Sequence, residues 1–133
     1  MFMGIKAILK EFKKRQDAEA QKNLVYSQNE TDTGMLWFDG KKIYRKVINC
    51  GALPNNSIKR VPINIENIDK VINLIMTALS KTNNLALSLP FHNINGDIVT
   101  AYKQNNDIIL GSNLDVSYYE TSFAILEYTK TTN

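Results

Sequence analysis

The chain has 133 residues, of which 44% are hydrophobic and 22% charged, and its formal net charge is +3. This length predicts one domain with at most a short appendage, and the apolar fraction is that of an ordinary globular protein. The charge is well short of what dedicated nucleic-acid binders carry, and no apolar run approaches the length of a membrane span. We therefore expect no nucleic acid as a partner and no membrane insertion.

The one cysteine, Cys50, and the one histidine, His92, restrict the chemistry that the chain can support. A single cysteine excludes an intrachain disulfide, and zinc takes three or four ligands. We interpret Cys50 as a buried, inert thiol, although the sequence leaves a Cys50 and His92 pair open. We therefore predict no catalytic residue, no metal and no cofactor. Lys6 and Lys10 interrupt the apolar start, which argues against a signal peptide and for synthesis in a cytoplasm.

The chain begins with a predicted amphipathic helix over residues 4–22. Its apolar stripe is formed by Ile5, Ile8, Leu9 and Phe12, which follow helical spacing. Such a helix is too short to be stable alone in water, so it must dock on the body, on a copy of itself or on a partner. Residues 24–34 are polar. We therefore divide the chain into a helix (1–23), a linker (24–34) and a β domain (35–133).

Residues 35–133 carry the signals of short strands separated by turns. Asp39 and Gly40 predict a two-residue type I′ hairpin turn, and residues 98–103 and 107–110 predict a second hairpin. Residues 69–80 are rich in β-branched side chains, which favours a buried strand over a helix. Residues 85–89 and 121–130 alternate with strand period. Seven or eight such strands indicate a β-sandwich or a small barrel, and we predict an antiparallel, jelly-roll-like β-sandwich.

Two separated stretches resemble the sequence motifs of a known family. The first consists of Trp37, Phe38, Asp39, Gly40, Lys41, Ile43, Tyr44, Lys46 and Ile48, followed by Gly51, Leu53, Pro54 and Asn55. The second contains Gly111, Ser112, Ser117 and Tyr118, and it leads into the closing strand SFAILEYTK. Together they resemble the C-terminal receptor-binding domain of tail-fibre proteins from phages and prophages of Gram-positive bacteria. The resemblance covers about the last hundred residues.

The resemblance implies a non-catalytic module of the virion tail that binds a host surface polysaccharide or teichoic acid. It also implies a homotrimer. In that setting the N-terminal helix is an attachment or trimerisation segment, which contacts other tail or baseplate proteins. Three alternatives stay open: a structural tail or baseplate component without a host ligand, a glycan-degrading enzyme, and a monomeric carbohydrate-binding module.

The turn-rich stretch before the last strand holds the candidate ligand-binding residues, Tyr118, Tyr119, Asn113 and Asp115. Adjacent side chains of an extended chain point to opposite sides, so we expect one tyrosine ring inside and the other outside. An outward ring stacks on sugar C–H groups while amide and carboxylate groups bind hydroxyls. A solvated loop is an equally good interpretation. We assign packing or interface roles to Trp37, Tyr44, Ile5, Leu9 and Phe12.

Overall fold

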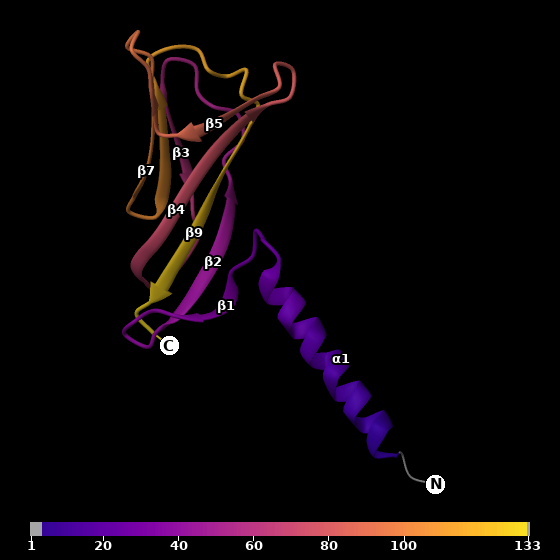
Figure 1. The fold of residues 1–133 in the computed structure, drawn as a ribbon. Coiled ribbons are helices and arrows are strands. Elements are labelled where there is room, and N and C mark those ends of the chain that lie inside the picture. Colours follow the sequence, from indigo (N-terminus) through magenta and orange to yellow (C-terminus); the bar gives the residue numbers. More distant parts are fainter. Residues whose placement is uncertain (1–3, 133) are drawn as a thin grey trace.

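A computed structural model describes residues 4–132 and, for residues 16–24, the backbone alone. The described residues form one helix and nine strands, which are arranged in two antiparallel sheets. The mainly β fold with an N-terminal helix, predicted from the sequence, is confirmed as a β-sandwich (Figure 1). The strands are β1 (Thr31–Leu36), β2 (Lys42–Asn49), β3 (Ile58–Pro62), β4 (Ile68–Ser80), β5 (Leu85–Leu89), β6 (Phe91–His92), β7 (Ile98–Gln104), β8 (Asp107–Ser112) and β9 (Thr121–Lys130).

The larger sheet has the order β1-β2-β9-β4-β5, and the smaller has the order β3-β8-β7-β6. Strand β9 is central because it pairs with β2 on one side and with β4 on the other. Its alternate residues Ala124, Leu126 and Tyr128 are fully buried between the sheets. Ile108 and Leu110 of β8 join them from the smaller sheet. The core therefore follows the two-residue period of the strands.

Helix α1 (Ile5–Leu24) follows Gly4 and runs away from the sandwich (Figure 1). Its stripe residues Ile5, Ile8, Leu9 and Phe12 are between 53% and 75% exposed. The helix predicted over 4–22 is thus present, and residues 1–3 of the predicted segment 1–23 lie outside the described residues. Among the described residues, no helix combines the length and the apolar character needed to cross a membrane.

Three details of the sequence-based assignment were wrong. The first hairpin closes through Phe38, Asp39 and Gly40, because Trp37 N donates to Lys41 O and only Gly40 has a positive φ, at 85°. This is a three-residue loop with a glycine bulge instead of a type I′ turn. The linker predicted to reach residue 34 ends at Thr31, where β1 begins. Strand β4 is buried only near its C-terminal end, since it lies in a sheet whose outer face is open.

Candidate functional site

Two turn-rich segments meet at the end of the sandwich opposite the C-terminus (Figure 1). Residues 113–120 connect β8 to β9, and residues 93–97 connect β6 to β7. The β7 and β8 pairing brings them together, because Val99 lies opposite Ser112. The side chain of Asn113 holds the two turns together through two hydrogen bonds. Its Oδ1 accepts from Ile98 N at 2.9 Å, and its Nδ2 donates to Gly96 O at 2.7 Å.

A pocket of about 150 Å³ opens between these turns and the end of β5; we call it the loop-end pocket. Its polar lining comes from two tyrosines and from the 93–97 turn, and its apolar lining comes from the edge of the core. The residues that line it are Leu87, Phe91, Asn93, Asp97, Val99, Leu114, Val116, Tyr118 and Tyr119. The lining of the loop-end pocket therefore combines apolar side chains with residues that carry hydroxyl, amide and carboxylate groups.

Tyr118 and Tyr119 form the aromatic part of this pocket. Tyr119 is 7% exposed and Tyr118 is 48% exposed, so one ring is inside and the other outside, as expected from the sequence. Their ring centroids are 4.8 Å apart with the planes tilted by 34°. Burial, together with the neighbouring Tyr118, raises the pKa of Tyr119 above the ordinary tyrosine value, which already keeps the hydroxyl protonated at neutral pH. The pair therefore places the exposed ring of Tyr118 beside the buried ring of Tyr119.

Asn93 and Asp97 supply the amide and the carboxylate, and neither was predicted as a site residue. Asn93 Nδ2 donates to Asp97 Oδ2 at 2.9 Å, while Asn93 Oδ1 accepts from the backbone N of Asn95 and of Asp97. These bonds fix the position of both side chains. The sequence predicted a turn here from Asn95 and Gly96, but only the sheet pairing shows that this turn faces the tyrosines.

Asn113 and Asp115, which the sequence predicted as ligand-binding, do not line the loop-end pocket. The amide of Asn113 is used in holding the 93–97 turn. Asp115 Oδ1 accepts from Ser117 Oγ at 2.6 Å and from Ser117 N at 3.0 Å, and these bonds lower the pKa of its carboxyl. Both residues shape the loop that carries Tyr118 and Tyr119.

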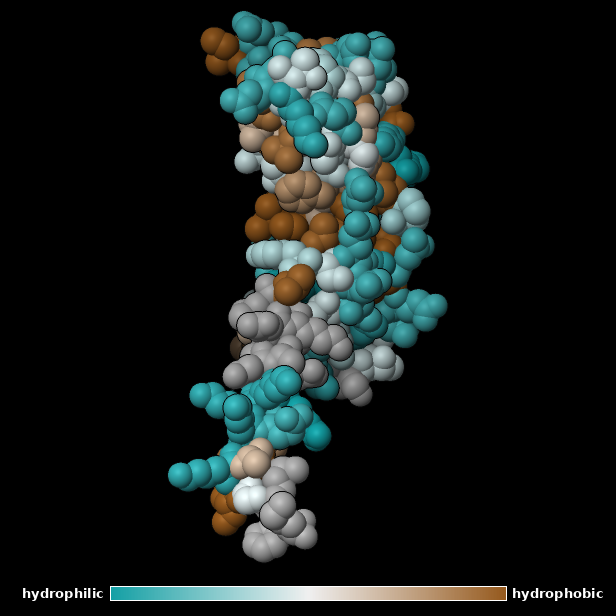
Figure 2. Space-filling view, turned by 90° about the vertical axis from the view of Figure 1, so that its right-hand side faces the viewer, coloured by the Kyte–Doolittle hydropathy of each residue, from teal (hydrophilic) through white to brown (hydrophobic). Residues whose placement is uncertain are grey.

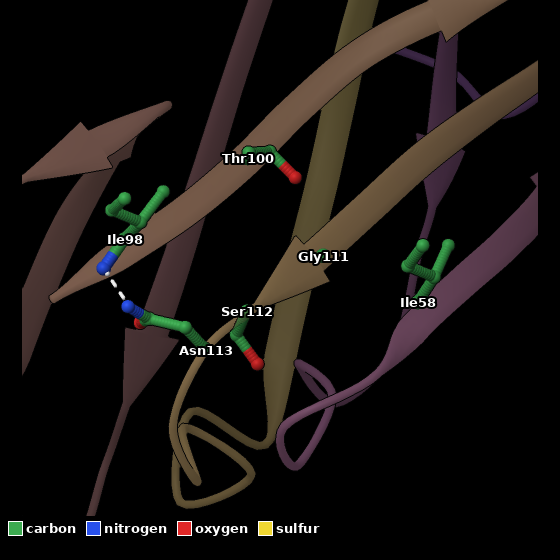
Figure 3. A pocket seen from close by; sticks show the side chains of 6 residues that line it. All are labelled: Ile58, Ile98, Thr100, Gly111, Ser112 and Asn113. Atoms are coloured by element: carbon green, nitrogen blue, oxygen red, sulfur yellow. Dashed lines mark hydrogen bonds between the residues drawn. The ribbon is translucent and has the colours of Figure 1, made fainter.

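A second, shallower groove crosses the outer face of the smaller sheet (Figure 3). Gly111 forms the floor of this groove between Ile58 and Ile98, and Thr100, Ser112 and Asn113 complete its lining. The groove has a volume of about 240 Å³. A Cβ at Gly111 would lie 2.7 Å from Thr100 Oγ1, so a side chain there has no room without a shift. This groove is mostly apolar and holds no charged side chain among its lining residues.

The remaining residues singled out in the sequence lie elsewhere. Tyr44 stacks on Tyr128 with ring centroids 6.1 Å apart and packs against the core. Trp37 lies beside Phe38 at the tip of the first hairpin, and its buried Nε1 has no hydrogen-bond partner within the described part of the chain. Cys50 is buried, and its burial raises the thiol pKa to about 11. His92 is exposed on β6.

The carboxylates do not gather at the loop-end pocket. Asp97 is the one carboxylate among the residues that line it, whereas glycoside hydrolysis uses two on either side of the scissile bond. Within residues 4–132, no three His, Cys, Asp or Glu side chains are grouped so as to hold a metal ion. Comparison of the chain with protein-family models, with curated proteins and with solved structures found no match.

Proposed function

We propose that this chain is a phage or prophage tail-fibre receptor-binding module that recognises a glycan on the host cell surface without catalysis. The observation that carries the proposal is the loop-end pocket, whose lining combines the exposed Tyr118 with Tyr119, Asn93 and Asp97. Aromatic faces pack on the apolar side of a sugar ring, and a few placed polar groups fix its orientation. The resemblance of residues 36–55 and 111–130 to tail-fibre receptor-binding domains supports the same role.

The position of this pocket favours contact with a large external surface. It lies at the end of the sandwich opposite the C-terminus, and α1 runs away from the body toward the other end (Figure 1). A module attached through its helix therefore presents the pocket outward. A pocket of about 150 Å³ holds little more than one sugar unit, which predicts weak binding per site. A homotrimer with three such pockets gains an avidity of roughly 10²–10⁴ over a single site.

The second candidate is a structural tail or baseplate component that binds no host ligand. Two exposed apolar surfaces favour it. The stripe of α1 is open to solvent, and Phe38 at the tip of the first hairpin is 89% exposed. Both suit permanent contacts within an assembly. This candidate differs from the first in a measurable way, since it gives the loop-end pocket no ligand.

Binding of the full chain to an array of bacterial cell-wall glycans, teichoic acids included, tests the proposal. We expect binding by the wild type and at least a tenfold loss in Tyr118→Ala, because the exposed ring face is removed. Tyr102→Ala is the matched control, since Tyr102 is 46% exposed on the smaller sheet and does not line the loop-end pocket. Equal binding by the wild type and Tyr118→Ala would overturn the proposed site. No binding to any glycan would favour the assembly component.

A further inference from the structure

The outer face of the larger sheet carries an apolar row where an open face of an antiparallel sheet is normally polar. Val47 of β2 lies directly opposite Ile125 of β9, and Ile125 lies opposite Ile75 of β4. Phe123 follows on the same face of β9. Ile75 is 47% exposed, and the other three side chains are partly exposed. We call Val47, Ile75, Phe123 and Ile125 the outer-sheet patch.

Tyr26 connects this patch to the helix. Tyr26 follows α1 by two residues, and with Val47, Phe123 and Ile125 it lines a hollow of about 370 Å³. Ser27 O accepts from Val47 N at 2.9 Å, which holds this connection against β2. Figure 2 shows apolar side chains gathered midway along this side of the body, above the helix. The patch therefore lies next to the connector that joins α1 to the sandwich.

The charges that border the patch are compensated within the chain. Arg45 Nη2 lies 3.0 Å from Glu127 Oε2, and Asn73 donates to the other carboxylate oxygen at 3.1 Å. The ring of Tyr26 lies 4.6 Å from the Arg45 guanidinium carbon. Both charged side chains are less than 20% exposed. Because Arg45 and Glu127 neutralise each other, this pair does not oppose the approach of a second copy of the face.

We infer that the outer-sheet patch and Tyr26 form the interface between copies of this chain, continuous with contacts between their helices. The inference rests on the proposed homo-oligomer and adds the face through which it forms. A stable interface buries about 800 Å² on each partner, which so few side chains do not supply alone. The exposed stripe of α1 is the second apolar surface available to this interface, since most helix stability in proteins comes from packing of an amphipathic face. In the proposed assembly a second copy covers both apolar surfaces.

The mass of the full chain in solution, measured by light scattering over a range of concentrations, tests this inference. We expect the wild type to be larger than a monomer and Ile75→Lys to weaken association at least tenfold. Ile75 is nearly half exposed, so lysine there is compatible with the folded monomer. Ile98→Lys is the matched control, because Ile98 is 39% exposed on the smaller sheet. We expect it to keep the wild-type mass.

Ile125→Lys is the second variant, since Ile125 is at the centre of the row, and far-ultraviolet circular dichroism verifies that each variant keeps its strands. An oligomer that persists in folded Ile75→Lys and Ile125→Lys would overturn the inference and leave the proposed multivalency intact. A monomeric wild type would overturn the inference and the homotrimer together. Neither result bears on whether Tyr118→Ala binds the array more weakly than the wild type, so failure of the glycan site is recognised separately.

Discussion

Asparagine is the residue that shapes most turns of this sandwich. The sequence contains sixteen asparagines, and those with a positive φ are Asn56, Asn64, Asn67, Asn84 and Asn105. Asparagine tolerates the left-handed region better than other residues with a Cβ, because its short amide bonds locally. Asn93 and Asn113 act instead through their side chains, which hold the 93–97 turn in place. The same residue type thus forms turns and positions the candidate site.

Cys50 gives a prediction at the level of one ionisable group. Burial raises its pKa from 9.0 to about 11, with Lys59 acting in the opposite direction. Between these pH values the folded chain keeps a proton that the unfolded chain has lost, so the free energy of unfolding falls as the pH rises. A pKa shift of this size corresponds to a loss of at most about 3 kcal/mol in the free energy of unfolding. Urea unfolding at pH 8 to 11 measures this fall. We expect a shallower fall in Cys50→Ala, and identical slopes would contradict the assignment.

The first hairpin shows what sequence predicts at the scale of an element. Asp39 and Gly40 correctly predicted a turn between β1 and β2, because Asp-Gly is one of the few residue pairs that favour a tight hairpin connection. The loop length was wrong because it depends on how Trp37 pairs with Lys41, which the dipeptide does not specify. The alternation of β9 was predictable in the same local way. The hollow beside Tyr26 was not predictable, since it depends on two strands, β2 and β9, and on the connector after α1.

Gly40 gives a prediction at this scale. Its φ of 85° is unfavourable for any residue with a Cβ, although nothing lies within 4 Å of the Cβ position. We therefore expect Gly40→Ala to lower the free energy of unfolding by about 1–2 kcal/mol through backbone strain alone. Gly40→Asn is the matched variant and is expected to lose less, because asparagine tolerates this region. Denaturant unfolding measures both, and equal losses would contradict a conformational cause.

The candidate site was only half predictable for a related reason. Tyr118 and Tyr119 stood out because two aromatic residues follow a turn-rich stretch directly before a strand. Asn93 and Asp97 were missed because their approach to the tyrosines depends on the register between β7 and β8. Asn113 and Asp115 were predicted as ligands because their side chains are polar, and the structure shows Asn113 bonded to Ile98 N and Gly96 O and Asp115 bonded to Ser117, with neither lining the pocket. Residue type therefore indicated the loop, and sheet register determined the pocket.

At the scale of the whole molecule, the loop-end pocket and the two exposed apolar surfaces lie at different positions along its length. The loop-end pocket is at one end, and the helical stripe extends toward the other (Figure 1). The outer-sheet patch lies between them on one side of the body. In a cyclic assembly whose axis runs along the helices, copies that meet through the patch and the helices point their pockets the same way. Weak sites then engage a polymer surface together, and the strength of attachment depends on how densely the glycan covers that surface.

Dissociation of the full chain from a glycan-coated surface, measured at low and at high glycan density, tests this account most directly; the glycan is the strongest ligand found on the array. We predict that high density slows release by roughly 10²-fold or more, because several pockets bind at once. Tyr118→Ala should release rapidly at both densities. Release that is independent of density, or unchanged in Tyr118→Ala, would contradict a multivalent receptor-binding module.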